Sequence, residues 1–174
     1  LLPHRELQIS RDGEIMVRGK KLFKGYLQGV SVEQPLQNGW FPSGDSGFLD
    51  EQGYLHVTGR RDNLIISGGE NIQPEEIEYH LLKMKEIEQA VVVSVPHPEY
   101  GQRPAAFIKY SESRPIAAGI LRRRLKRELP DFKIPDHFFQ WPDIETAGLK
   151  ISRPHLQKIA LDLIYKLNRD PDQS

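Results

Sequence analysis

The chain contains no cysteine. This absence excludes disulfide bonds, thiolate metal ligands and a cysteine nucleophile, and it suits a reducing compartment, so we expect a cytoplasmic protein. No apolar run approaches the ~20 residues that a membrane-spanning helix requires, and the first residues lack the layout of a signal peptide. The sequence therefore predicts no membrane partner.

The chain also lacks an excess of either charge. Its 24 basic and 24 acidic residues cancel, so no long-range field attracts nucleic acid, and no nucleic-acid partner is expected. With 38% hydrophobic and 28% charged residues over 174 positions, the composition is that of a globular protein with one domain and part of a second. The chain begins without Met inside a strand-like pattern, so we expect a piece of a longer protein.

The first sixty residues are rich in β-hairpin signals. Apolar and polar residues alternate on both sides of Asp12-Gly13, a tight-turn pair. A second hairpin is indicated by apolar residues at 48–49 and 54–57, which flank a four-residue turn. Residues 1–61 are therefore expected to form a β-rich segment.

The period of the pattern changes after Arg61. Pro74 at a first-turn position suits the start of a helix, and the pattern predicts this helix over 74–84. Glu75 and Glu76 are interpreted as residues that favour the positive end of the helix dipole, rather than as an acid-base pair.

Helical and strand patterns continue to the end of the chain. Residues 62–174 are therefore expected to form a small α+β unit, with a flexible tail at 168–174. The further predicted elements are strands at 90–95, 105–110 and 138–141, a helix at 116–129 with Ile120 on its apolar face, and a helix from Pro154 with Leu167 on its apolar face.

Asp45 lies between two glycines in the stretch from Trp40 to Gly47. A carboxylate in this setting can accept two hydrogen bonds from neighbouring hydroxyls, such as those of a ribose diol. Ser-Gly-Asp is also common loop chemistry, and a turn aspartate is the simpler interpretation of these residues alone.

Two arginines follow Gly59 at the end of the second hairpin. The planar guanidinium of Arg60 can fork onto phosphate or ribose oxygens, or it can form a surface ion pair. Asp62 is either the cap of a local turn or a backbone pivot. Gly68 and Gly69 supply either a tight turn or a close approach of backbone to a ligand. The residues alone leave these alternatives open.

Lys150 lies in a polar, glycine-containing segment ahead of the last helix. A lysine there can neutralise charge that develops on a carboxylate and an α-phosphate, or it can be a solvated surface residue. The basic residues 122–127 form either a solvated helix face or a phosphate contact. The six histidines show no ligand spacing with carboxylates, so no protein-bound metal is expected.

The stretches Trp40 to Gly47, Gly59 to Glu78 and Thr146 to Arg153 resemble signature motifs of the adenylate-forming acyl-CoA synthetases. The resemblance extends over about residues 6–167. It implies a role for each candidate residue. Asp45 holds the ribose of ATP and of the acyl-adenylate, Arg60 contacts the nucleotide, Asp62 is a hinge, Gly68 and Gly69 line the pantetheine tunnel, and Lys150 is essential for adenylation.

The resemblance also implies the architecture and the ligands. Residues 1–61 correspond to the end of a large N-terminal domain and 62–174 to a mobile C-terminal domain, in an α+β fold. The expected ligands of the intact enzyme are ATP with Mg2+, CoA and a small-molecule carboxylic acid. The phosphate-binding loop and the acyl pocket of the family lie outside this sequence, so we expect the chain alone to be inactive.

A narrower similarity points to one group within the family. Ser43 stands where the family usually has threonine, and Leu149 stands where it usually has glycine. The stretches similar to the 2-succinylbenzoate:CoA ligases of bacterial menaquinone synthesis are Arg61 to Leu64, Ser67 to Glu76, Tyr100 to Pro104 and Gly148 to Arg153.

Other functions remain alternatives at this point. The chain can belong to another acyl- or aryl-CoA ligase, or to an adenylating enzyme that loads a carrier protein. A non-catalytic interaction domain of the same fold is a second class, and a nucleic-acid module built on the arginine-rich helix is a third. Exposed strand edges in 1–61 also predict some self-association.

Overall fold

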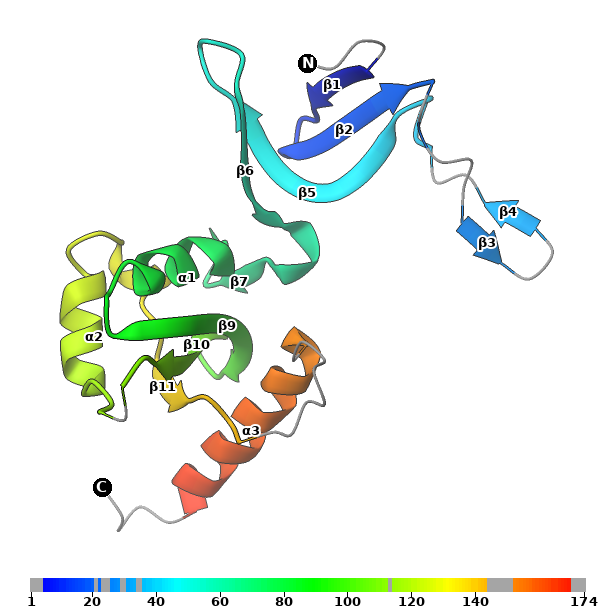
Figure 1. Ribbon diagram of the computed structural model, residues 1–174. Helices are drawn as coiled ribbons and strands as arrows, with labels where there is room; N and C mark the ends of the chain where they lie inside the picture. Colours follow the sequence, from blue (N-terminus) through cyan, green and yellow to red (C-terminus); the bar gives the residue numbers. More distant parts are fainter. Residues whose placement is uncertain are drawn as a thin grey trace. The chain divides into compact units, whose positions relative to one another are not determined.

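Two compact units make up the computed structural model, Leu1–Asp62 and Asn63–Ser174 (Figure 1). We treat each unit by itself. The structure describes residues 5–20, 22, 26–28, 31–33, 36–112, 114–143 and 152–169.

The N-terminal unit contains an antiparallel sheet in the order β1-β2-β5-β6. Both predicted hairpins are present, because β1 pairs with β2 and β5 pairs with β6. The turn of the first hairpin places Gly13 at a φ of 82°, and the turn of the second places Gly53 at 80°, in the left-handed region that glycine adopts most readily. The strands are β1 (Arg5–Ile9), β2 (Glu14–Gly19), β5 (Phe41–Leu49) and β6 (Leu55–Arg60), and a separate pair is formed by β3 (Tyr26–Gln28) and β4 (Ser31–Glu33).

The C-terminal unit is built on a five-stranded sheet covered by helices on both faces. The path β11-β10-β7-β8 runs through the sheet, and β9 pairs with β10. Only β10 and β11 are parallel among these pairs. The short helix η1 (Arg61–Asn63) contains the point in the chain where one unit ends and the next begins. The elements of the C-terminal unit are β7 (Ile65–Ser67), β8 (Glu70–Ile72), α1 (Pro74–Leu82), β9 (Ile87–His97), β10 (Gly101–Tyr110), α2 (Ala118–Leu125), η2 (Asp131–Lys133), β11 (His137–Gln140) and α3 (Arg153–Arg169).

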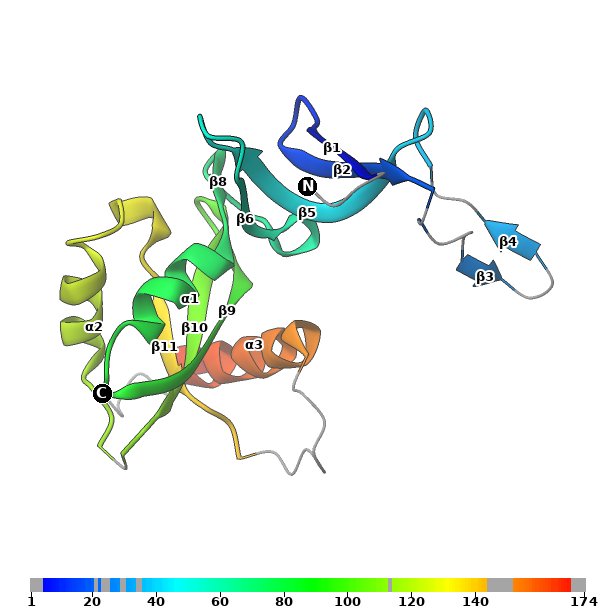
Figure 2. The same cartoon turned by 45° about the horizontal axis from the view of Figure 1, so that its top comes forward.

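Alternate residues of the central strands face two separate apolar clusters, as the two-residue period of a strand requires. On β9, Val92 packs with Leu81 and Leu121 beneath α1 and α2. Its neighbour Val93 packs with Leu156 beneath α3. Figures 1 and 2 show α1 and α2 on one face of the sheet and α3 on the other. This arrangement confirms the predicted α+β fold class.

Some predicted details are wrong. Helix α2 ends at Leu125 rather than 129, and Ile120 is 37% exposed although it was expected on the apolar face. Leu167 is 57% exposed, because the residues of α3 that pack in the apolar cluster under this helix end at Ile164. Helix α3 includes residues 168 and 169, whereas the rest of the predicted tail lies outside the described residues.

Strand β8 is an element that the sequence pattern did not predict. Gly68 and Gly69 have φ angles of 58° and 88°, and two consecutive positive φ angles are typical of a type I′ hairpin turn. The turn pairs Ile65 of β7 with Ile72 of β8, and both residues are fully buried. The paired glycines therefore close a β-hairpin at the entrance to α1.

Candidate functional site

Two candidate aspartates of the N-terminal unit, Asp45 and Asp62, both contact the guanidinium of the candidate Arg60. Asp45 of β5 is paired across the sheet with Arg60 of β6. Arg60 Nη1 lies 3.2 Å from Asp45 Oδ1, and Arg60 Nη2 lies 3.2 Å from Asp62 Oδ2. These hydrogen bonds, first that to Asp62 and then that to Asp45, raise the pKa of Arg60. Arg60 therefore remains a cation beside two carboxylates.

The cluster remains accessible from solvent. The side chains of Asp45 and Arg60 are 37% and 48% exposed, so both are partly in contact with solvent. Gly44 lies under the guanidinium with a φ of 74°, and a Cβ at this position would come within 3.0 Å of Arg60 Nη2. The glycine before Asp45 thus permits the contact between the two strands.

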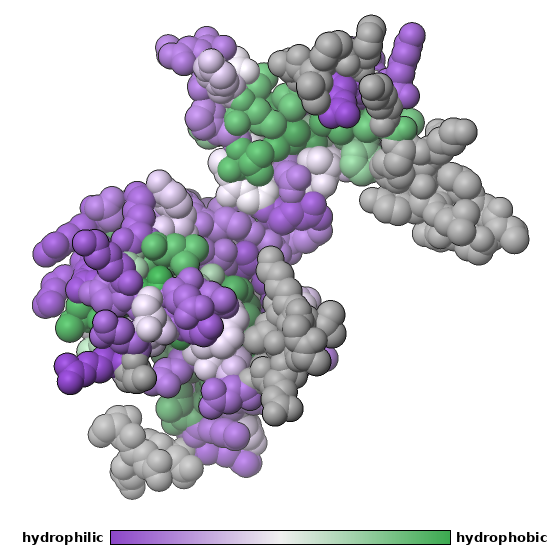
Figure 3. All heavy atoms as spheres, viewed as in Figure 1, coloured by the Kyte–Doolittle hydropathy of each residue, from purple (hydrophilic) through white to green (hydrophobic). Residues whose placement is uncertain are grey.

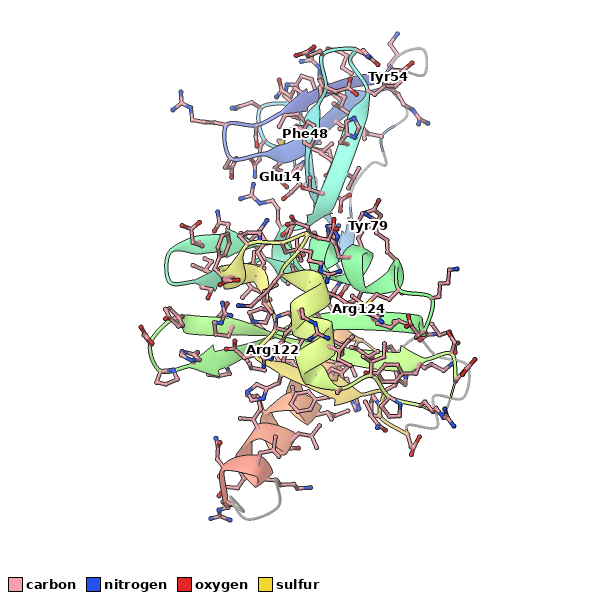
Figure 4. The ribbon with its side chains drawn as sticks, turned by 90° about the vertical axis from the view of Figure 1, so that its left-hand side faces the viewer. Glu14, Phe48, Tyr54, Tyr79, Arg122 and Arg124 are labelled. Atoms are coloured by element: carbon pink, nitrogen blue, oxygen red, sulfur yellow. The ribbon has the colours of Figure 1, made fainter. Side chains whose placement is uncertain are left out.

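Glu14 is a member of this site that the sequence analysis missed. Its Oε1 accepts a hydrogen bond from the Gly44 N–H at 3.0 Å, and its Oε2 accepts one from Arg61 Nη1 at 3.1 Å. Figure 4 marks Glu14 among the strands of the N-terminal unit. The sequence signal for this residue is limited to a glutamate directly after the turn glycine Gly13, at the first position of β2.

The Gly68-Gly69 turn approaches protein backbone closely. The Gly68 N–H donates a hydrogen bond to the Tyr100 carbonyl at 2.9 Å, and a Cβ on Gly68 would lie 3.1 Å from Tyr100 Cδ1. A Cβ on Gly69 would meet nothing within 4 Å. The first glycine is therefore required by the Tyr100 contact and the second faces open space.

Arg103 supports this turn from within the C-terminal unit. The residue is only 9% exposed, and its guanidinium forms a bidentate pair with Asp136 at 3.0 and 2.9 Å. It also donates to the carbonyls of Phe132 and Ile134 and lies 3.4 Å from Ser67 Oγ. A buried arginine with this many partners fixes the segments that it joins. One of those segments is β7, which leads into the Gly68-Gly69 turn.

Lys150 lies outside the described residues, and of its motif the structure describes Ser152 and Arg153. Arg153 Nη1 donates to Glu78 Oε1 at 2.6 Å, and its Nη2 donates to Glu75 Oε1 at 3.1 Å. Glu75 also accepts a hydrogen bond from Asn63 Nδ2 at 2.5 Å. Glu75 lies in the first turn of α1, as predicted, and its carboxylate also joins the start of α3 to the first residue of the C-terminal unit.

Residues 76–148 match the family model of the AMP-binding enzyme C-terminal domain. The chain carries this domain. The chain is 43% identical over 159 residues to a 2-succinylbenzoate–CoA ligase of Oceanobacillus iheyensis, and this alignment covers 90% of the chain and 33% of the relative. It is 35% identical over 150 residues to the peroxisomal trans-cinnamate:CoA ligase of Petunia hybrida, with 85% and 26% covered. The resemblance inferred from the motifs is confirmed.

Solved structures agree with this assignment. The o-succinylbenzoate CoA synthetase of Bacillus subtilis, in complex with its acyl-adenylate intermediate, superposes with a TM-score of 0.78 at 37% identity and covers 90% of this chain and 34% of that one. The same enzyme with ATP and magnesium gives 0.76 at 37% identity, with 89% and 34% covered. The chain spans about a third of the length of the curated relatives it matches.

Two cations of the basic segment 122–127 in this domain are paired with carboxylates. Arg124 pairs with Glu86 at 3.1 Å, and Lys126 pairs with Asp131 at 3.2 Å. Arg122 donates to the Asp136 carbonyl and lies over the ring of Phe138, so the expectation that all these residues face outward is wrong for Arg122. These contacts favour the interpretation as a helix face rather than a phosphate site.

Within the described part of the chain, no group of three or more histidine, aspartate or glutamate side chains is arranged to hold a metal ion. No helix in that part is long and apolar enough to cross a membrane.

Proposed function

We propose that this chain is the C-terminal part of an ATP-dependent acid–thiol ligase. Such an enzyme joins a carboxylate to the α-phosphate of ATP, releases pyrophosphate, and then transfers the acyl group to a thiol with release of AMP. The observation that carries the proposal is the accessible cluster of Asp45, Arg60 and Asp62 directly before an AMP-binding C-terminal domain.

In the adenylation step, Asp45 binds the ribose of ATP and Arg60 contacts the nucleotide. A carboxylate can accept both hydrogen bonds of a ribose diol, and a guanidinium suits phosphate or ribose oxygens. Lys150 stabilises the negative charge that develops on the reacting carboxylate and α-phosphate. Mg2+ arrives with ATP, as supported by the Bacillus subtilis relative that was solved with both.

In the thioester step, the C-terminal unit turns about Asp62 and brings the Gly68-Gly69 turn to the thiol of CoA. The division of the chain into compact units after Asp62 supports this hinge. The open space at Gly69 supports a backbone surface along which the pantetheine arm can lie.

The acid is 2-succinylbenzoate in this proposal. Five further relatives with 36 to 40% identity carry the name 2-succinylbenzoate–CoA ligase. The trans-cinnamate relative at 35% identity names a competing aromatic acid. The proposal that CoA accepts the acyl group rests on the names of the same relatives. We place the enzyme in the cytoplasm, and we propose that the 174-residue chain alone does not catalyse either step.

Separate measurement of the two steps tests the proposed role of Lys150. In the intact enzyme, Lys150→Ala should lower acid-dependent pyrophosphate release at least about a hundredfold, in line with the loss of one transition-state contact. Thioester formation from supplied acyl-adenylate should remain within about threefold of wild type, because that step does not use the lysine.

The exposed Lys158 of α3 offers a matched control. Lys158→Ala should leave both steps unchanged. Normal adenylation by Lys150→Ala would overturn the lysine's role, and equal loss of both steps would show that the substitution damages the domain as a whole.

A further inference from the structure

The candidate motif Ser43-Gly44-Asp45 occupies an interruption in the sheet. Met16 pairs with Pro42 and Glu14 pairs with Ser46, so the three residues of the motif lie opposite the single residue Ile15. Extra residues in one strand form a bulge, which redirects side chains and leaves backbone groups without a ladder partner. The direction in which Asp45 projects therefore depends on what holds the bulge.

Glu14 binds the bulge at its centre. Its Oε1 accepts a hydrogen bond from the Gly44 N–H at 3.0 Å, and its Oε2 accepts one from Arg61 Nη1 at 3.1 Å. The side chain is only 14% exposed, and Arg61 is also paired with Asp12 at 2.6 Å. A shielded carboxylate with a charge-assisted hydrogen bond on each oxygen has a defined position.

We propose that Glu14 is a positioning residue for nucleotide binding. It holds the bulge so that Asp45 presents its carboxylate to the ribose, and it ties the bulge to Arg61, which lies between Arg60 and Asp62 in the chain. This inference rests on the proposed ribose contact of Asp45. Asp45 lies one residue beyond the bonded N–H of Gly44, so a shift of the bulge moves the carboxylate directly.

The sheet provides a matched control in Glu6. Glu6 of β1 also forms an ion pair, with Arg18 of β2, but its side chain is 59% exposed and its contacts lie within the β1-β2 hairpin. An exposed pair of this kind contributes little. Glu6→Ala therefore reports the effect of losing a glutamate on the same sheet without disturbing the bulge.

Two conservative variants of Glu14 separate the effect of side-chain length from the effect of charge. Glu14→Asp keeps the charge but is one methylene shorter and cannot reach both Gly44 and Arg61. Glu14→Gln keeps the length and an acceptor oxygen for the Gly44 N–H. In the intact enzyme at saturating acid, Glu14→Asp should raise the KM for ATP about tenfold with kcat changed less than about threefold, the effect of one lost charge-assisted hydrogen bond on uniform binding.

Glu6→Ala should keep the KM for ATP within about threefold of wild type. Glu14→Gln keeps an acceptor for the Gly44 N–H but places its NH2 group against Arg61, so its effect on the KM for ATP should lie between those of Glu6→Ala and Glu14→Asp. A merely structural role would lower the melting temperature of Glu14→Asp without a change in KM, and this result would overturn the inference. A larger KM effect in Glu14→Gln than in Glu14→Asp would also overturn it, because charge rather than position would then matter.

Asp45→Ala, measured in parallel, distinguishes failure of the inference from failure of the proposed function. If Asp45→Ala raises the KM for ATP while Glu14→Asp does not, Asp45 binds nucleotide without help from Glu14. If Asp45→Ala leaves the KM unchanged, the ribose contact itself is wrong and the positioning role falls with it.

Discussion

His137 shows how the environment of one residue sets its charge. The imidazole stacks on Phe139 with ring centroids 5.7 Å apart. Burial lowers the pKa of His137 below the ordinary value of 6.5, and the neighbouring Asp136 only partly offsets this effect. The folded protein therefore favours the neutral ring.

This shift predicts a pH dependence of stability. Below pH 6.5, the ordinary pKa of histidine, the unfolded chain binds a proton at His137 more readily than the folded chain does. The contribution of His137 to the free energy of unfolding is therefore complete above pH 6.5 and is lost as the pH falls through the lowered pKa of the folded state. Urea unfolding of the 174-residue chain between pH 7.5 and 5.5 should show this loss, and His137→Gln should reduce it. His155→Gln at an exposed position is the control. An unchanged pH profile in His137→Gln would contradict the shift.

Helix α2 illustrates how elements are stabilised by one buried face. Leu121 and Leu125 are fully buried, whereas Ile120 is 37% exposed. The sequence pattern placed all three inward, because a window that continues to 129 contains apolar residues on more than one side. The structure ends the helix at Leu125 and buries Leu129 in the turn that follows.

The difference between Ile120 and Leu121 gives a paired prediction. Leu121→Ala should lower the free energy of unfolding by about 3 kcal/mol, because it leaves a cavity between α2 and the sheet. Ile120→Ala should change it by less than about 1 kcal/mol, because that residue is 37% exposed and outside the core cluster. Urea unfolding of the two variants measures the difference. Equal losses would show that α2 packs with a different face.

The predictable part of the molecule follows from local patterns, and the rest depends on contacts between distant residues. The hairpins, α1, β9 to β11 and the α+β class were predicted from alternation, helix periodicity and turn residues. The motif also singled out Asp45, Arg60 and Asp62. Glu14 and Arg103 were missed, because their partners Gly44 and Asp136 lie 30 and 33 residues away, and a local pattern does not show which distant residues meet.

The exposed apolar side chains of the second hairpin predict that the chain associates with copies of itself. Phe48, Tyr54 and Val57 are 52%, 67% and 62% exposed, and apolar surface of the N-terminal unit is visible as green spheres in Figure 3. Such a surface favours association. Sedimentation velocity of the 174-residue chain should show self-association that weakens in Phe48→Ser. A purely monomeric profile at high concentration would contradict this prediction.

We propose that this chain completes an enzyme that converts 2-succinylbenzoate to its CoA thioester. The most direct test is to incubate the intact enzyme with ATP, Mg2+, CoA and either 2-succinylbenzoate or trans-cinnamate, and to identify the products by mass spectrometry. We predict 2-succinylbenzoyl-CoA and AMP with the first acid and a much slower reaction with the second. A thioester from trans-cinnamate alone would contradict the proposed acid, and the absence of AMP with both acids would contradict the ligase itself.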